Sequence, residues 1–223
     1  MKIPNNKIAH RGMFDNIKIP ENSIAAFKKA LKYNYSIELD VQLTKDNVLV
    51  VFHDENLKRM TGIDKLIQDS NYKEIKDLKL LNTKEYIPTL DEVLKLIDNK
   101  VLLDIEVKST KKIKEITNIL KDKLKEYNNY VLKSFDPRIV RNLKSTIPNT
   151  EIGYLIDGKR KILYSNFIIK YSKADFLSIS KKLLKTKKFN KLKNKYQLLI
   201  WTIKDKDEIK DENIIYICND LPY

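Results

Sequence analysis

Short hydrophobic segments alternate with longer amphipathic segments along the whole chain, which predicts strands alternating with helices. The expected strands are Lys7–Ala9, Ile37–Leu43, Val48–Phe52, Val101–Val107, Tyr130–Lys133, Ile152–Ile156, Phe176–Ile179, Leu198–Ile203 and Ile214–Ile217. The expected helices are Asn22–Tyr33, Leu90–Ile97, Thr110–Glu126, Pro137–Ser145, Ile162–Ile169, Lys181–Lys193 and Lys206–Asp211. Because no Gly/Ser-rich or Pro-rich linker divides this pattern, we expect a single α/β domain over residues 1–223.

The expected strands outnumber those of a (β/α)8 barrel by one, and one short junction accounts for the surplus. The segment Lys45-Asp46-Asn47 before Val48–Phe52 is too short for a parallel crossover, and its Asp and Asn tolerate positive φ. We therefore expect a hairpin extension after the second strand, with the other eight strands forming a TIM (β/α)8 barrel without a large inserted subdomain. Residues 64–82 are expected to form short helices and loops at one mouth of this barrel.

The net charge bears on the expected partners, and the cysteine content bears on the expected location. The net charge of +14 comes mostly from scattered lysines, because only five residues are arginine. Nucleic-acid recognition favours the arginine fork, so we expect no nucleic-acid partner; the lysines can still attract anionic substrates or an anionic membrane surface. With a single cysteine, no apolar leader and no stretch of about 20 apolar residues, we expect a cytoplasmic protein. The oligomeric state is left open.

Acidic residues recur at alternate positions of two predicted strands. Glu38 and Asp40 lie on one, Asp104 and Glu106 on another, and a spacing of two places each pair on one face. Any one carboxylate could merely pair with a lysine. Several converging carboxylates would repel one another without a counter-charge, and a hard divalent cation would supply it. We therefore expect Glu38, Asp40 and Glu106 to bind a metal ion.

The two histidines of the chain lie at the ends of predicted strands. His10 follows the first strand and His53 follows the hairpin strand, so both are expected at the barrel mouth where such enzymes place their active sites. Imidazole exchanges protons near neutral pH, which favours an acid/base pair over two separate structural histidines. Arg11 and Lys108 would then neutralise the oxygens of a bound phosphate.

At these residues the sequence resembles the glycerophosphodiester phosphodiesterase family. The matching motifs include Ala9-His10-Arg11-Gly12, Pro20-Glu21-Asn22-Ser23, Ile37-Glu38-Leu39-Asp40-Val41, Phe52-His53-Asp54, Leu103-Asp104-Ile105-Glu106-Val107-Lys108, Ser134-Phe135 and Trp201-Thr202-Ile203. The resemblance implies a barrel enzyme that hydrolyses glycerophosphodiesters to sn-glycerol 3-phosphate and an alcohol, with one divalent metal ion, Ca²⁺ or Mg²⁺ or Mn²⁺. It also implies that Glu21 orients the arginine or shapes the site, and that Trp201 lines the substrate pocket, although a buried core tryptophan is an alternative.

Departures from the family pattern concern the substrate end of the site. Lys204 stands where asparagine is common, and Asn219 stands where threonine is usual. The alcohol that is released is therefore left open, as is the attacking group, which is either the neighbouring glycerol hydroxyl or water. One alternative is a phosphodiesterase for lysophospholipids or glycerol-phosphate envelope polymers. Another is a non-enzymatic basic module, which would give no reason for the carboxylates and histidines to gather.

Overall fold

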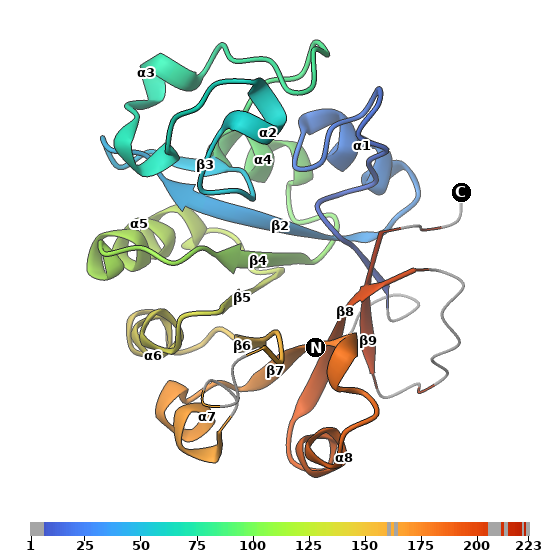
Figure 1. The fold of residues 1–223 in the computed structure, drawn as a ribbon. Coiled ribbons are helices and arrows are strands. Elements are labelled where there is room, and N and C mark those ends of the chain that lie inside the picture. Colours follow the sequence, from blue (N-terminus) through green and yellow to red (C-terminus); the bar gives the residue numbers. More distant parts are fainter. Residues whose placement is uncertain are drawn as a thin grey trace.

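The computed structural model describes residues 7–159, 162, 165–204, 211, 214–219 and 221. Eight parallel strands pair in sequence order, and the last pairs with the first, so the sheet closes into a barrel (Figure 1). The strands are β1 (Lys7–Ala9), β2 (Ser36–Leu43), β4 (Leu103–Val107), β5 (Tyr130–Ser134), β6 (Ile152–Ile156), β7 (Phe176–Ser180), β8 (Gln197–Ile203) and β9 (Ile215–Cys218). The predicted TIM barrel is confirmed.

The additional strand β3 (Leu49–Val51) forms the predicted hairpin with β2. The two strands are antiparallel, with Val41 opposite Val51 and Leu43 opposite Leu49. Asn47 adopts a φ of 63° in the turn, a conformation that asparagine tolerates better than most residues. The hairpin brings the chain back toward the barrel mouth, and His53 follows at its end.

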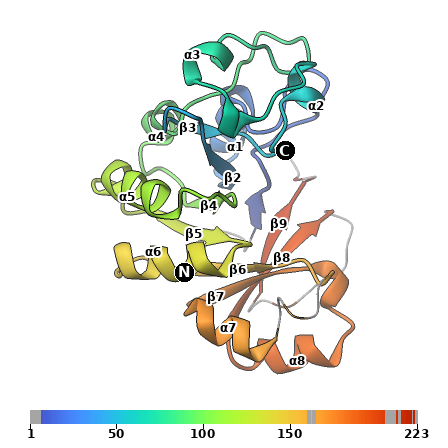
Figure 2. The ribbon, with the colours of Figure 1, turned by 60° about the vertical axis from the view of Figure 1, so that its left-hand side comes forward.

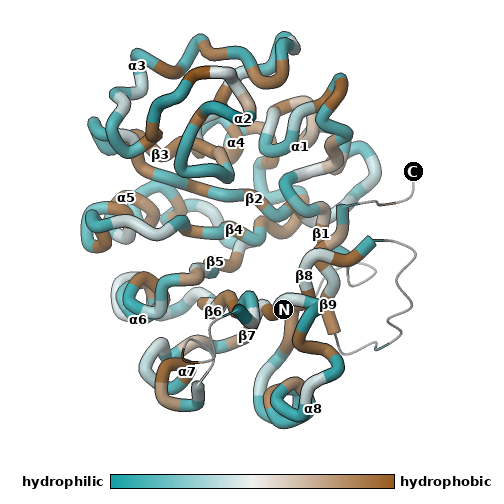
Figure 3. The backbone as a smooth tube through the Cα atoms, in the orientation of Figure 1, coloured by the Kyte–Doolittle hydropathy of each residue, from teal (hydrophilic) through white to brown (hydrophobic). Residues whose placement is uncertain are grey.

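In the part of the chain that the structure describes, six helices cover the outside of the barrel (Figures 1 and 2). They are α1 (Ile24–Lys32), α4 (Leu90–Ile97), α5 (Ile113–Leu124), α6 (Pro137–Thr146), α7 (Asn166–Ser172) and α8 (Lys187–Lys193). Each buries hydrophobic side chains and exposes lysine or arginine, and Figure 3 shows hydrophobic and hydrophilic positions mixed around them as this arrangement requires. Most of the hydrophobic core lies between these helices and the strands.

Hydroxyl caps move two predicted helix boundaries. Instead of one helix over Lys181–Lys193, the chain forms a 3-10 turn, η4 (Lys181–Leu183), and then α8, because the Thr186 side chain accepts a hydrogen bond from the Phe189 amide and starts a new helix. The helix predicted over Ile162–Ile169 begins later, at Asn166, because Ser165 caps it. The helix predicted over Lys206–Asp211 falls, except for its last residue, outside the described residues.

The segment between β3 and α4 contains only short helical turns. They are α2 (Lys58–Thr61), η2 (Ile67–Asp69) and α3 (Tyr72–Ile75). Their apolar side chains pack against β3 in a small cluster separate from the main core. The short helices expected over residues 64–82 are thus present, beside the β2–β3 hairpin. Among the described residues, none of the helices has the length and apolar character that a membrane span requires.

The inside of the barrel is apolar at one end and charged at the other. The apolar end is filled by a cluster that includes Phe176, Leu199 and Ile217. Beyond it, toward the carboxyl ends of the strands, the inward-facing positions of β2, β4 and β5 are acidic or basic. This charged end carries the candidate site.

Candidate active site

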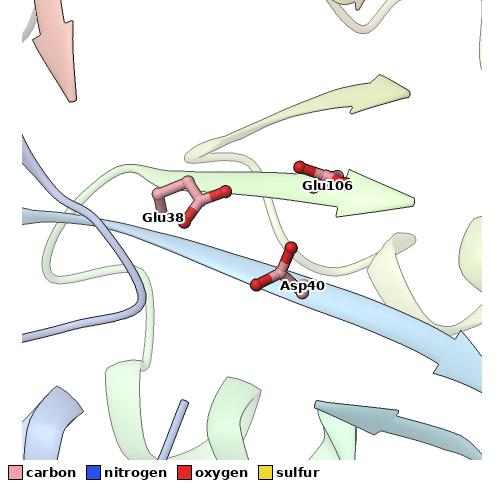
Figure 4. A group of neighbouring side chains, drawn as sticks. All are labelled: Glu38, Asp40 and Glu106. Atoms are coloured by element: carbon pink, nitrogen blue, oxygen red, sulfur yellow. The ribbon is translucent and has the colours of Figure 1, made fainter. Parts of the chain in front are cut away.

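Four carboxylates project from two neighbouring strands into the barrel. In the parallel register of β2 and β4, Glu38 lies beside Asp104 and Asp40 lies beside Glu106. All four residues are buried. Oxygen atoms of Glu38, Asp40 and Glu106 lie within 4.8 Å of one another, and their side chains gather over the two strands in Figure 4. The spacing-of-two pattern in the sequence therefore brings the three expected metal ligands together.

The chemistry of this group suits a hard divalent cation. Carboxylate oxygens are the preferred ligands of calcium and magnesium, and three of them from the protein leave positions for water and substrate. Burial raises the pKa of Glu106, and this effect outweighs the nearby positive charge of Lys108, which lowers it. The neighbouring carboxylates of Asp40 and Glu38 raise the pKa further. A bound cation would remove that cost, so the residues present fit the ion.

Lys108 forms ion pairs with two of the three carboxylates. Its Nζ lies 2.7 Å from an Asp40 oxygen and 2.6 Å from a Glu106 oxygen. Burial alone would raise the pKa of Asp40, but Lys108 and Arg11 hold it well below its usual range. For Lys108 the directions are reversed: burial lowers its pKa, and the carboxylates of Asp40 and Glu106 raise it by more. Asp40 is therefore a permanent anion at the centre of the site, and Lys108 a permanent cation.

A second, deeper ion pair was not anticipated from the sequence. Lys133 on β5 is only 1% exposed, and its Nζ lies 2.6 Å from Asp104 and 3.4 Å from Glu38. Burial raises the pKa of Asp104 to about 6 even though Lys133 lowers it. Lys133 lies opposite Glu106 in the pairing of β4 with β5. A lysine inside the strand that follows the acidic one was therefore the sequence signal that could have indicated this ion pair. Lys133 also interacts with one of the two carboxylate oxygens of Glu38.

The loop after β1 holds Arg11 between two acidic residues. Gly12 has a φ of 81°, and a Cβ there would lie 2.9 Å from Ala26, so the turn requires glycine. Arg11 donates a hydrogen bond of 2.7 Å to Glu21, and its Nε lies 3.5 Å from Asp40. Arg59 also donates to Glu21, at 2.7 Å. Glu21 therefore ties both arginines to the mouth of the barrel.

Glu21→Gln is expected to destabilise the protein by about 3 kcal/mol at pH 7. Burial raises the pKa of Glu21, but Arg59 and Arg11 outweigh it and lower the pKa from 4.5 to about 2. The charge of Glu21 thus stabilises the fold above pH 4.5, and this stabilisation is lost as the pH falls toward 2. In urea unfolding, the cost of the substitution should therefore be smaller at pH 3.5 than at pH 7 by about 1 kcal/mol or more.

The control for this measurement is Glu126→Gln. Glu126 is exposed after α5, and its loss should change stability by less than about 0.5 kcal/mol at both pH values. An equal cost of Glu21→Gln at pH 7 and pH 3.5 would mean that the ion pairs with the arginines do not stabilise the folded state.

Both histidines line one cavity, and a polar partner orients each ring. The Nδ1 of His53 lies 2.6 Å from an Asp54 carboxylate oxygen, which can only accept, so this nitrogen carries the proton. The Nδ1 of His10 lies 2.6 Å from Asn219 Oδ1 and is assigned the same role. Each ring is left with Nε2 for chemistry, and that of His10 lies 3.9 Å from Glu38. Burial lowers the pKa of His10, partly offset by Glu38.

Three further residues orient the side chains of the candidate site. Asn22 donates a hydrogen bond of 2.9 Å to Asp40, Asn219 holds His10 as described, and Asp54 accepts from both His53 and Arg59. Burial raises the pKa of Asp54, but the bond from Arg59 lowers it to about 2, so it stays ionised. The position after His53 marks Asp54 in the sequence, whereas Asn219 lies 209 residues from His10 and carries no local signal.

The cavity has a volume of about 320 Å³ and two unlike walls. His10, Arg11, Glu38, His53 and Glu106 line one side. The other side comes from the ends of β5 to β9 and includes Phe135, Leu155, Trp201 and Ile217. Trp201 is half-buried and packs edge to face against Phe135, with ring centroids 5.6 Å apart. It lies at the cavity and not only in the core.

Comparison with known proteins is in line with this geometry. The sequence profile of the glycerophosphoryl diester phosphodiesterase family matches residues 10–217. A glycerophosphodiester phosphodiesterase of Caldanaerobacter subterraneus is 42% identical over 160 residues, which is 66% of this chain and 65% of that protein, so under two thirds of its length is matched.

Two solved structures share the fold. A glycerophosphodiester phosphodiesterase of Parabacteroides distasonis has a TM-score of 0.80 at 27% identity, over 96% of this chain and 92% of that one. A phosphodiesterase of Oleispira antarctica, solved in complex with its product sn-glycerol 3-phosphate, has a TM-score of 0.81 at 23% identity, over 96% and 93% of the two chains.

Proposed function

Because this chain belongs to the glycerophosphoryl diester phosphodiesterase family, a family of phosphoric diester hydrolases, we propose that it hydrolyses glycerophosphodiesters to sn-glycerol 3-phosphate and an alcohol. The observation that carries the proposal is one cavity lined by both histidines and by two of the three clustered carboxylates, Glu38 and Glu106. The product bound to the Oleispira antarctica relative supports the same chemistry.

Glu38, Asp40 and Glu106 would hold one divalent metal ion, calcium or magnesium or manganese. When bound, such an ion supplies positive charge to the phosphate and to the charge that develops during reaction. Arg11 and Lys108 add preorganised cations to the same region, since both already lie beside Asp40. Glu21 holds Arg11 in place, and Trp201 forms part of the wall against which the substrate packs.

The two histidines carry the proton transfers. One Nε2 accepts the proton of the attacking hydroxyl, from the neighbouring glycerol carbon or from water, as its oxygen bonds to phosphorus. The bond from phosphorus to the leaving alcohol oxygen breaks, and the other imidazolium donates its proton to that oxygen. Asp54 stabilises positive charge on His53, while Asn219 keeps the reactive nitrogen of His10 directed into the cavity. If the glycerol hydroxyl attacks, water then opens the cyclic phosphate.

Release of sn-glycerol 3-phosphate is the direct test. The purified protein is treated with EDTA and assayed on glycerophosphocholine, glycerophosphoethanolamine and glycerophosphoglycerol, before and after adding calcium, magnesium or manganese. We expect no turnover with EDTA and restored turnover with at least one ion, because three buried carboxylates would then regain their counter-charge.

Absence of sn-glycerol 3-phosphate with every ion would contradict the proposal. Turnover of lysophospholipids or of glycerol-phosphate polymers in place of the small diesters would move the assignment to those substrates. The cytoplasmic location and any contact with an anionic membrane stay predictions.

A further inference from the structure

The mouth of the active-site cavity carries charges that the proposed chemistry does not use. Asp157 and Lys159 follow β6, and Lys182 follows β7, and all three line the cavity opposite the histidines. Both lysines are exposed, so they lie where the cavity opens to solvent. The proposed function instead assigns the reacting phosphate to Arg11, Lys108 and the carboxylates. The two lysines therefore face whatever part of a bound diester extends toward solvent.

Neither lysine forms an ion pair with another of the residues that the structure describes. The carboxylate of Asp157 accepts a hydrogen bond of 2.8 Å from the Lys159 amide, which turns it toward its own loop. Among the residues that the structure describes there, the mouth presents the two ammonium groups of Lys159 and Lys182 against the one carboxylate of Asp157. A cationic group arriving there would meet net repulsion, and an anionic one net attraction.

The size of the cavity determines which group reaches these charges. A volume of about 320 Å³ is at the small end of ligand pockets, which suits the phosphate and one three-carbon unit. The apolar faces of Phe135 and Trp201 can pack against the carbon atoms of a substrate. A longer alcohol would extend toward solvent, where Lys159 and Lys182 line the opening.

We propose that Lys159 and Lys182 select diesters whose alcohol carries a second negatively charged group, such as a further phosphate, over diesters with a cationic alcohol such as choline. This inference rests on the proposed function and specifies its substrate class. It follows from the position of two unpaired ammonium groups at the opening of the cavity, and the net charge of +14 acts in the same direction by attracting anions to the protein.

A matched pair of substrates tests the selection. Glycerophosphoglycerol and the same diester with a phosphate on the far hydroxyl differ only in that group, and glycerophosphocholine supplies the cationic case. The wild-type protein is compared with the double variant Lys159→Gln/Lys182→Gln. The control is Lys185→Gln/Lys187→Gln, which removes two exposed lysines that do not line the cavity. The readout is the ratio of kcat/KM between substrates.

We expect the wild-type protein to favour the phosphorylated diester over glycerophosphoglycerol, with glycerophosphocholine last. The double variant should lower the first ratio about three- to tenfold, since an exposed charge pair contributes up to about 1 kcal/mol. Added salt should lower the wild-type ratio in the same way. The control pair should keep the wild-type ratio.

Other outcomes separate this inference from the proposed function. If the variant loses the same factor on all substrates, the lysines contact the reacting phosphate and the inference is wrong. A wild-type preference for glycerophosphocholine, or a ratio equally lowered by the control pair, would also overturn it while leaving the hydrolysis intact. If the wild-type protein hydrolyses none of the diesters, the proposed function fails, and the inference fails with it.

Discussion

Replacing either His10 or His53 by alanine is expected to lower kcat on a glycerophosphodiester by about 10²- to 10⁴-fold. Each ring has one nitrogen held by a polar partner, Asn219 for His10 and Asp54 for His53, and the other left for proton transfer. Removing one ring leaves the attacking oxygen without its base or the leaving oxygen without its acid. Steady-state assays with the metal ion at saturation measure the loss.

The double variant separates a paired mechanism from two independent roles. Groups that act in one proton-transfer sequence are not additive, so His10→Ala/His53→Ala should be only slightly slower than the slower single variant. Thermal unfolding serves as the control, because both rings are partly exposed and their loss should leave the fold intact. Activity within tenfold of wild type in either single variant would remove that histidine from the mechanism.

Glu106→Gln is expected to weaken divalent metal binding by more than about 100-fold. Substituting a residue that only orients a metal ligand typically lowers metal affinity 10- to 100-fold. Glu106 belongs to the carboxylate group itself, so the loss of affinity should be larger. Glutamine keeps the volume and one oxygen but removes the charge. Calorimetric titration of the EDTA-treated protein measures the affinity, and the rise in melting temperature on adding metal gives a second readout without any assay of turnover.

Glu115→Gln is the matched control for that substitution. Glu115 is exposed in the first turn of α5, and its loss should leave the metal affinity unchanged. If Glu106→Gln binds metal as tightly as the wild-type protein does, the ion is held elsewhere and the carboxylate group serves only to pair with Lys108.

The barrel could be predicted because its signals are local. Alternating strand and helix segments, and a junction too short for a crossover, were sufficient to predict eight parallel strands and a hairpin. Helix boundaries were less predictable. Thr186 and Ser165 start helices by accepting hydrogen bonds from the backbone, and such caps interrupt a pattern that hydrophobic spacing alone would continue.

The candidate site was predictable where strand periodicity or the end of a predicted strand indicated it, as for His10 and His53. Glu38 and Asp40 share a face of one strand, so their meeting with Glu106 needed only the right pairing of β2 with β4. The ion pair of Lys133 with Asp104 depends on the register of a third strand, β5. In a chain with many lysines, one more lysine is not a specific sequence signal. Partners brought together by closure of the barrel could not be found from spacing at all.

Closure of the barrel between β1 and β9 also determines when during synthesis the protein can acquire its site. The His10 amide donates to the carbonyl of Cys218, and the His10 ring is held by Asn219, 209 residues further along the chain. While the ribosome is still making β8, the clustered carboxylates of β2 and β4 are already translated, but Asn219, the partner of His10 Nδ1, is not. A nascent chain therefore cannot complete the geometry around His10 until β9 and Asn219 have emerged.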